Sequence, residues 1–361
     1  MARMSFGGVI EDVVTREEVT LKRARETLRD ERIVVVGYGV QGPAQGLNLR
    51  DNGFNVRVGL PVERARSWEK AVRDGWIPGK TLLPLADAVA DATIVLFLVS
   101  DAGQRALWPS IEPLLGERSA LYFSHGFSVA YSDQTGVVPP PFVDVLLVAP
   151  KGSGTSVRAN YLAGSGINSS FAVHQDFTGR ARERALAIGI GIGSGFLFPT
   201  TFEKEVHSDL TGERGILMGA LAGVMEAQYE TLRAHGHSPS EAFNESVEEL
   251  TQSLIRLVGE NGMDWMYANC SATAQRGALD WRPRFKAAVA PLFEDLYASV
   301  LRGEETRVVL EANGADDYQE RLDEELHQMR ESEMWQAGVT VRSLRPENAT
   351  AAVVQKEGAR A

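Results

Sequence analysis

The sequence predicts an α/β fold: an N-terminal domain built on a Rossmann-type, doubly wound parallel sheet, followed by an all-helical domain. Two observations favour it. Short apolar strands alternate with helical stretches over the first 200 or so residues, the pattern of a parallel sheet. From about residue 202 the apolar residues recur at helical spacing. We expect a dinucleotide-binding domain at 1–201, a helical metal and substrate domain at 202–346, and a disordered tail at 347–361, which is small and polar.

Length, charge and cysteine content narrow the class of protein. The chain has 361 residues, enough for two domains, and it contains no run of about 18 apolar residues. Its one cysteine, Cys270, excludes an intrachain disulfide and a thiolate metal cluster and fits a reducing compartment. The net charge of −11 argues against general nucleic-acid binding. Because no apolar signal core opens the chain, we expect a cytoplasmic, bacterial protein, or a mitochondrial one if a transit peptide has been removed.

The first recognisable element is a strand, a glycine-rich turn and a helix. Residues 33–36 (Ile-Val-Val-Val) predict a buried strand, and a helix pattern covers 41–52. Between them lies the G-x-G-x-x-G formed by Gly37, Tyr38, Gly39, Val40, Gln41 and Gly42. Glycines at this spacing let backbone N–H groups approach a pyrophosphate at the helix N-terminus, so we predict a dinucleotide site. The alternative is an ordinary tight turn without a ligand.

The second strand, 55–59, bears on the choice of nucleotide. NAD-binding chains commonly carry an acid at its end to hold the ribose 2′-hydroxyl, but here the strand ends in glycine and leucine. The following loop supplies Arg64, Arg66 and Ser67, which suit a 2′-phosphate and favour NADP(H). Glu63 lies in the same loop, so NAD(H) binding and a merely solvated helix start stay open.

Three further strands are expected at 93–99, 120–124 and 143–149. Ligands of doubly wound sheets bind past the carboxyl ends of the strands. Ser100, His125 and Lys151 each follow closely after one of these ends, so we expect them to face the cofactor cleft. The alternative for the histidine and the lysine is an ordinary surface position. A segment rich in glycine and isoleucine, 186–198, is predicted to be the last buried segment of this domain.

The stretch 203–250 carries an excess of acids. It holds ten acids against three bases, a net of −7. Asp209 with Glu213, and Glu245 with Glu249, are spaced i,i+4, so each pair projects from one face of a helix. Clustered carboxylates need a counter-charge, and Mg²⁺ prefers oxygen ligands, so we predict a magnesium site. The alternative is a solvated helix face.

A predicted helix start precedes each of these two acid pairs. Thr200-Thr201-Phe202-Glu203 has the spacing of a capping box that would begin a helix at about residue 201. Ser238-Pro239-Ser240-Glu241 predicts a second start, and its helix would run to about residue 259. The pattern from there to about residue 342 is again helical.

These motifs, in this order, resemble ketol-acid reductoisomerase (acetohydroxyacid isomeroreductase). The resemblance covers roughly residues 5–346 and is closest to the short, class I form of fungal type. It is carried by the glycine-rich turn at 37–42, Ser-His-Gly-Phe at 124–127, Ala-Pro-Lys-Gly-Ser-Gly at 149–154, Asp-Leu-Thr-Gly-Glu at 209–213, and the helix carrying Glu245 and Glu249. Val40 and Pro61 stand where the family usually has polar and basic residues, which leaves the preference for NADPH over NADH open.

The resemblance implies roles for individual residues. Asp209 would bridge two Mg²⁺ ions and Glu213 would bind one of them. Glu245 and Glu249 would form the second carboxylate pair, with Glu249 also touching the substrate, and Ser271 would hold the substrate carboxylate. His125 and Lys151 match family active-site positions, so His125, Lys151 and Glu249 are the expected catalytic residues. The family's helical domains interlock in a homodimer, possibly within a higher oligomer, and the partner's carboxylates complete each site.

The implied reaction is an alkyl shift in 2-acetolactate, or 2-aceto-2-hydroxybutanoate, followed by reduction with NADPH to the 2,3-dihydroxy acid. It belongs to the biosynthesis of valine and isoleucine. Two rival interpretations remain: a metal-independent NADP-dependent hydroxyacid dehydrogenase, and a nucleotide-sensing module without chemistry. Activity that survives a chelator would favour the first, and nucleotide binding without turnover the second.

Overall fold

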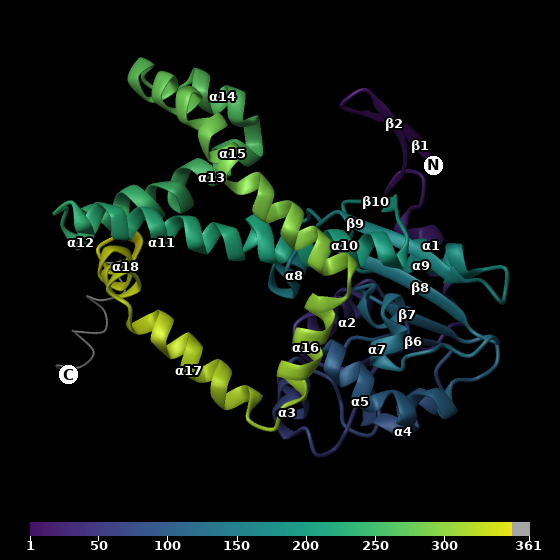
Figure 1. Cartoon of the computed structure of the whole chain (residues 1–361). Helices are drawn as coiled ribbons and strands as arrows, with labels where there is room; N and C mark the ends of the chain where they lie inside the picture. The colour runs from purple at the N-terminus through teal and green to yellow at the C-terminus, as the bar shows by residue number, and fades with distance from the viewer. Residues whose placement is uncertain (349–361) are drawn as a thin grey trace, which may run out of the picture. The chain divides into compact units, whose positions relative to one another are not determined.

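A computed structural model describes residues 1–348 of the chain (Figure 1). The tail predicted at 347–361 lies, from residue 349 on, outside the described residues. The structure divides into two compact units. The first comprises Met1–Asp209 and a returning segment, Gly303–Asn313; the second comprises Leu210–Arg302 and the chain from Gly314 onward. The first unit therefore extends past the predicted boundary at residue 201 and includes a segment from far along the chain.

The first unit is built on one sheet of ten strands in the order β1-β2-β10-β9-β8-β7-β6-β3-β4-β5. The strands are β1 (Ala2–Phe6), β2 (Val9–Thr15), β3 (Ile33–Val36), β4 (Val56–Leu60), β5 (Leu82–Pro84), β6 (Ile94–Phe97), β7 (Ala120–Phe123), β8 (Asp144–Pro150), β9 (Ser169–Gln175) and β10 (Phe196–Pro199). From β5 to β8 all neighbours are parallel, with Val36 opposite both Gly59 and Phe97. The predicted doubly wound parallel sheet is confirmed for this part.

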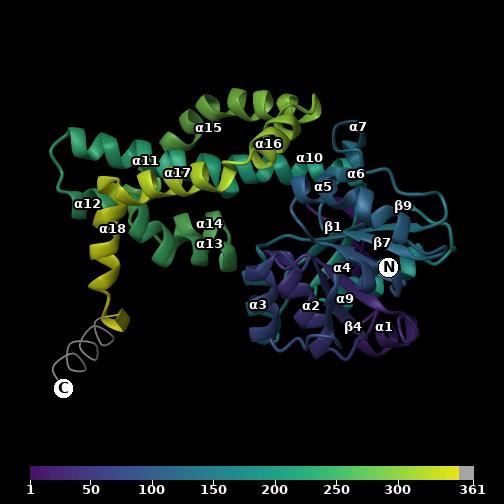
Figure 2. The ribbon, with the colours of Figure 1, turned by 90° about the horizontal axis from the view of Figure 1, so that it is seen from below.

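Helices cover both faces of the sheet (Figure 2). They are α1 (Leu21–Thr27), α2 (Gln41–Asp51), α3 (Ala65–Arg73), α4 (Leu85–Ala90), α5 (Asp101–Ile111), the 3₁₀ helix η1 (Glu112–Leu114), α6 (Phe127–Ala130), α7 (Ser132–Thr135), α8 (Gly154–Leu162) and α9 (Ala181–Gly191). Alternate side chains of β3 point to the two opposite faces of the sheet, each of which is covered by helices. Ile33 and Val35 join the apolar core beneath α1, α2 and α9, whereas Val34 and Val36 join the core beneath α4 and α5. A strand buried on both faces reads as an unbroken apolar run.

The other end of the sheet departs from the parallel pattern. Strand β9 runs antiparallel to β8, β10 is parallel to β9, and β2 is antiparallel to both β10 and β1. The segment 186–198, expected as one buried element, is instead the end of α9 and most of β10. Its uniform apolarity hid the turn at Gly193, whose φ of +88° lies in the left-handed region that favours glycine.

Helix α10 (Phe202–Gly212) leads out of the sheet and carries Asp209. Its cap differs from the predicted one. The backbone N–H of Lys204 donates to the hydroxyl of Thr201, at 3.1 Å, so Thr201 and not Thr200 caps the first turn. Both residues have the right chemistry, and only the chain direction after β10 decides between them.

The second unit is helical, as predicted. Its helices are the π-helix η2 (Glu213–Leu217), α11 (Gly219–Ala234), α12 (Pro239–Phe243), the π-helices η3 (Asn244–Glu248) and η4 (Leu250–Leu254), α13 (Ile255–Asn261), α14 (Met263–Ala268), α15 (Ala272–Leu301), α17 (Tyr318–Glu331) and α18 (Glu333–Ser343). Ser238 caps α12 by accepting from the N–H of Glu241, which confirms that predicted start. The continuous helical course of α12 to α13 matches the predicted helix, but its middle is π-helical, a geometry frequent at functional sites.

Helix α16 (Glu304–Gly314) belongs almost wholly to the first unit. The amide of Gln134 donates to the carbonyl of Gly303 at 3.2 Å, and Thr306 and Leu310 are buried. Among the described residues no helix is long and apolar enough to cross a membrane.

A buried ion-pair network ties α9 to the sheet. Arg184 is 6% exposed and contacts Glu31 Oε1 at 2.8 Å and Asp144 Oδ2 at 2.8 Å. Asp144 is fully buried and also accepts from the N–H and hydroxyl of Thr178. Because both carboxylates are out of water, the guanidinium is needed to offset their desolvation.

We expect Arg184→Leu to lower the free energy of unfolding by about 3–5 kcal/mol, because it leaves the buried Asp144 without a counter-charge and leaves Glu31 only the more distant, exposed Arg180. Urea denaturation followed by circular dichroism measures this. The matched control is Arg57→Leu, which breaks an ion pair with Asp91 in which the aspartate is half exposed; that loss should stay below about 1 kcal/mol. Equal effects of the two substitutions would contradict this account.

Candidate functional site

The glycine-rich turn between β3 and α2 has no room for side chains at two of its glycines. Gly37 has a φ of +103°, and a Cβ there would lie 2.6 Å from the carbonyl oxygen of Leu98. A Cβ on Gly42 would lie 2.1 Å from the carbonyl oxygen of Gly37. At Gly39 nothing lies within 4 Å, so the middle of the turn is open. The turn thus closes tightly on itself while leaving backbone free at the N-terminus of α2, as phosphate binding requires.

A cavity of about 540 Å³ lies over this turn, inside the first unit. Most of the residues predicted to bind the cofactor line it: Gly37, Tyr38, Gly39, Val40, Gln41, Arg64, Ser67 and Ser100. His125 lines it as well, so the predicted active-site histidine and the predicted nucleotide residues share one cavity. Its size suits a small-molecule or cofactor ligand.

Two contacts fix the shape of this cavity. Tyr38 is buried, and its hydroxyl donates to Asp74 Oδ2 at 2.9 Å and accepts from Trp76 Nε1 at 2.7 Å. These two hydrogen bonds hold the side chain of Tyr38, and with it the glycine-rich turn, in place. A Cβ on Gly154, at the start of α8, would lie 2.0 Å from the carbonyl oxygen of Val40. The loop after β8 therefore packs directly against the glycine-rich turn.

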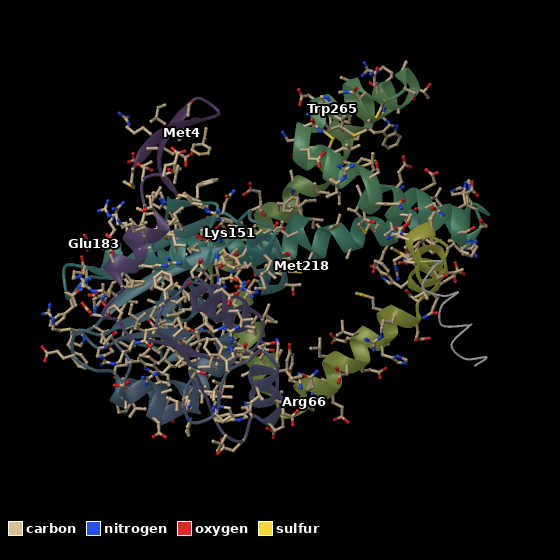
Figure 3. All side chains as sticks on the ribbon, turned by 180° about the vertical axis from the view of Figure 1, so that it is seen from behind. Met4, Arg66, Lys151, Glu183, Met218 and Trp265 are labelled. Atoms are coloured by element: carbon tan, nitrogen blue, oxygen red, sulfur yellow. The ribbon has the colours of Figure 1, made fainter. Side chains whose placement is uncertain are left out.

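The three residues predicted for the loop after β4 lie differently, because helix α3 already begins at Ala65 and so includes Arg66 and Ser67. Arg64 and Ser67 line the cavity, whereas Arg66 is exposed on α3 and is not among the lining residues (Figure 3). Lys70, one turn further along α3, donates to the carbonyl oxygen of Gly39 at 3.1 Å. Lys70 was not predicted as a site residue from the sequence. The feature that could have found it is its position shortly after Arg64 and Arg66, the two basic residues that were predicted.

The centre of the site is a carboxylate that the sequence did not single out. Glu205, on α10, is 1% exposed. Its Oε2 accepts from the backbone N–H of Gly126 at 2.7 Å and lies 3.0 Å from His125 Nδ1, and its Oε1 accepts from Lys151 Nζ at 2.8 Å. One turn later on the helix, Asp209 lies 3.2 Å from Lys151 Nζ and 3.4 Å from His125 Nδ1.

The charges in this cluster stabilise one another. Burial opposes the charge of His125, but the hydrogen bond and negative charge of Glu205, helped by Asp101 and Asp209, outweigh it and raise its pKa to about 9. Burial also opposes ionisation of Glu205, yet His125 and Lys151 lower its pKa to about 2. Burial disfavours the ammonium of Lys151 too, and the carboxylates overcome this and raise its pKa. At neutral pH the two bases are therefore cationic and Glu205 is anionic.

This cluster also has the composition of a cation site. One ligand atom each from His125, Glu205 and Asp209 lies within 4.8 Å of the others. Carboxylate oxygens are the donors that Mg²⁺ takes, and Lys151 would have to yield its contact with Asp209 to a bound ion. The donor set therefore fits a hard divalent cation on the Asp209 side of the cluster.

The remaining predicted residues belong to the second unit. Glu213 follows α10 directly, at the start of η2. Glu245 and Glu249 are exposed on the π-helical stretch, while their neighbour Glu248 is buried. Ser271 is exposed and caps α15, accepting from the N–H of Ala274 at 3.2 Å. The structure thus brings His125, Lys151 and Asp209 together in the first unit and displays the other acids on the surface of the second.

Glu205 and Asp101 belong to the candidate site, and reasoning from the sequence missed both. Glu205 stands four residues before Asp209, so the spacing that selected Asp209 and Glu213 extends one turn backwards. Asp101 follows Ser100 and lines the cavity, and burial raises its pKa. Neither stood out because helices and loops carry many acids at such positions.

Comparison with known proteins shows which family the chain resembles over its length. A family model described as "Acetohydroxy acid isomeroreductase, NADPH-binding domain" matches residues 27–196, and one described as "Ketol-acid reductoisomerase, C-terminal domain" matches residues 202–347. The chain is 66% identical over 348 residues to a protein of Desulfosudis oleivorans named "Ketol-acid reductoisomerase (NAD(+))", covering 96% of this chain and 99% of that protein. It is 54% identical to the mitochondrial ketol-acid reductoisomerase of Neurospora crassa, covering 96% and 86%. The solved structure of an NADH-preferring ketol-acid reductoisomerase from an uncultured archaeon matches 93% of this chain and 99% of its own, with a TM-score of 0.83 and 32% identity.

Proposed function

The chain belongs to the ketol-acid reductoisomerase family of branched-chain amino-acid biosynthesis, and we propose on this premise that it rearranges and reduces 2-acetolactate with the help of two Mg²⁺ ions. The observation that carries the proposal is the position of His125. It lines the nucleotide cavity and lies 3.4 Å from Asp209 and 3.0 Å from Glu205. A substrate held at the carboxylates would therefore lie beside the nicotinamide end of a bound cofactor.

The roles of the chain's residues follow from their contacts. Asp209 and Glu213 would hold the ions from one helix end, and Glu245 and Glu249 would supply the second carboxylate pair. When bound, the cations would supply Lewis-acid polarisation of the ketone and hydroxyl oxygens of the substrate. Lys151 Nζ, held by Glu205, would carry the proton that moves between those oxygens during the alkyl shift. Glu205 would keep His125 and Lys151 oriented throughout, because its carboxylate is already committed to both.

The chemistry balances as follows. The methyl group moves from C2 to the neighbouring carbonyl carbon, the old hydroxyl becomes a ketone, and the old ketone becomes a hydroxyl. A hydride from the nicotinamide and one proton then reduce the new ketone to give 2,3-dihydroxy-3-methylbutanoate. Only the first half needs strong charge stabilisation on two oxygens, so the acids matter most there.

We expect Asp209→Asn to lower turnover of 2-acetolactate by at least about 100-fold, since it removes a carboxylate from the site of charge development. Reduction of the supplied rearranged 2-keto acid should fall less. Cofactor oxidation on both substrates, with Mg²⁺ and with EDTA, measures the division.

The matched control is Glu203→Gln, an exposed acid on the same helix, which should leave both half-reactions unchanged. Equal loss of both halves in Asp209→Asn would count against the division of labour. Full activity in EDTA would instead favour a metal-independent hydroxyacid dehydrogenase.

The nicotinamide cofactor is proposed to be NADPH, bound through Arg64 and Ser67 at the cavity wall. A guanidinium at this point suits a 2′-phosphate. NADH is the second candidate, since the Desulfosudis oleivorans relative is named for NAD(+) and Glu63 would repel a phosphate.

We expect Arg64→Ala to lower the ratio of kcat/KM for NADPH to that for NADH by about tenfold, the equivalent of one charge-assisted hydrogen bond. Arg66→Ala, which removes an arginine outside the cavity lining, should leave the ratio unchanged. Steady-state kinetics with both nucleotides decide the matter. A wild-type chain that prefers NADH, with a ratio indifferent to Arg64, would overturn the choice of NADPH.

We also infer a homodimer in which each site takes Glu245 and Glu249 from the partner. The apolar surface of the second unit supports this. Leu292 is 67% exposed, Ile216 64% and Phe285 60%. Exposed apolar side chains in this number mark a protein interface.

Complementation tests the shared site. Co-expression of an Asp209→Asn chain with a Glu249→Gln chain should restore about one quarter of wild-type activity, because half of the dimers are mixed and one of their two sites is intact. The two variants expressed separately provide the baseline. Activity that stays at the baseline in purified mixed dimers would place Asp209 and Glu249 of one chain in the same site.

A further inference from the structure

Glu248 differs in burial from its two neighbours, Glu245 and Glu249, which form the second carboxylate pair. It lies directly before Glu249 and three residues after Glu245, yet both of those acids are exposed and Glu248 is 6% exposed. Its carboxylate is held by Arg345, whose Nε and Nη2 donate to the two carboxylate oxygens at 2.7 and 2.8 Å. A planar guanidinium bound through two parallel hydrogen bonds fixes orientation as well as distance.

Arg345 lies just beyond the end of α18, which packs against α12 (Figures 1 and 2). A Cβ on Gly338 would lie 2.5 Å from the ring of Phe243, so the two helices approach closely. Met334 and Trp335 of α18 join the apolar cluster that contains Phe243 and Val247.

The other end of α18 is held by α11. Glu333 accepts from the hydroxyl of Tyr229 at 2.8 Å and pairs with Arg233. In turn, Gln228 of α11 donates its amide to the backbone carbonyl of Glu245 at 2.8 Å. The π-helical stretch with the acid pair is therefore fixed on two sides, by α11 and by α18.

We propose that Glu248 and Arg345 are positioning residues for Mg²⁺ binding: their bidentate pair sets the rotation of the π-helical stretch, so that Glu245 and Glu249 face outward together. Consecutive residues of a helix point in directions that its geometry fixes relative to one another, so anchoring Glu248 inward constrains where Glu249 points. Carboxylates that bind a metal must be held to within about 0.5 Å by their supporting contacts. A buried ion pair is best attested in this role of fixing register. The inference rests on the proposed assignment of Glu245 and Glu249 as metal ligands.

The test measures Mg²⁺ binding directly. MgCl₂ is titrated into the metal-stripped full-length chain by calorimetry, without substrate, and thermal unfolding is recorded beside it. Glu248→Gln and Arg345→Lys should each raise the apparent dissociation constant for Mg²⁺ by about tenfold or more, the usual effect of removing a contact that supports a ligand. The charge-swapped double variant, Glu248→Arg with Arg345→Glu, should recover part of the loss.

Two controls separate positioning from general stability. Arg256→Gln breaks an exposed pair with Glu260 on the following helix, α13, and should change Mg²⁺ affinity less than about twofold. Glu333→Gln loosens the far end of α18 but leaves the Glu248 pair, so it should lower the unfolding temperature with little change in Mg²⁺ affinity. If Glu333→Gln weakens Mg²⁺ binding as much as Arg345→Lys at the same loss of stability, the pair is merely structural and the inference fails.

Mg²⁺ binding by the unsubstituted chain distinguishes a failure of the proposed function from a failure of the positioning role. If this chain binds no Mg²⁺, the proposed function fails. If it binds Mg²⁺ and the Glu248 and Arg345 variants bind equally well, the proposed function stands and the positioning role is overturned.

Discussion

The arrangement of the site depends on one buried carboxylate. Glu205 accepts hydrogen bonds from the loop after β7, through Gly126, and from the loop after β8, through Lys151. A charged group that is 1% exposed is stable only when its oxygens are fully paired, so α10 must lie where both loops can reach it. The same helix then carries Asp209 one turn further. The position of Asp209, which would bind metal, thus follows from the position of the buried Glu205.

Backbone contacts reinforce this constraint. A Cβ on Gly126 would lie 2.2 Å from the carbonyl oxygen of Phe202, and a Cβ on Gly154 would lie 2.0 Å from that of Val40. Loops from neighbouring strands therefore meet α10 and the nucleotide turn without intervening side chains. Because peptide groups are less adaptable than side chains, the cavity and the acidic cluster hold a fixed relation inside the first unit. A rigid first unit suits a reaction in which hydride donor and substrate must meet at one distance.

The second unit differs from the first in the side chains that its surface exposes. Its helices display acids at Glu245 and Glu249 and large apolar side chains such as Phe285 on their surfaces. Such a surface is costly in water for a lone chain, which is why we propose that a second copy covers it. The π-helical turns at these acids also favour a functional role for this surface, since that geometry is frequent at functional sites. Helix α18 then acts as the support that keeps these turns in register.

The sequence by itself determined the local features: the strand, glycine turn and helix at 33–51, the Ser238 cap, the spacing of the acid pairs, and the residues after strand ends. Each depends on side-chain chemistry within a few residues, which a linear pattern records. It also led to the family, which the comparisons confirm. Only the tertiary structure decided that Glu205 joins His125 across 80 positions, that Glu248 turns inward to Arg345 across 97, and that 303–313 returns to the first unit. It also decided that β1, β2, β9 and β10 extend the sheet, with every pairing antiparallel except that of β9 with β10. These outcomes depend on which distant groups share a desolvated space, and no spacing within the chain encodes that.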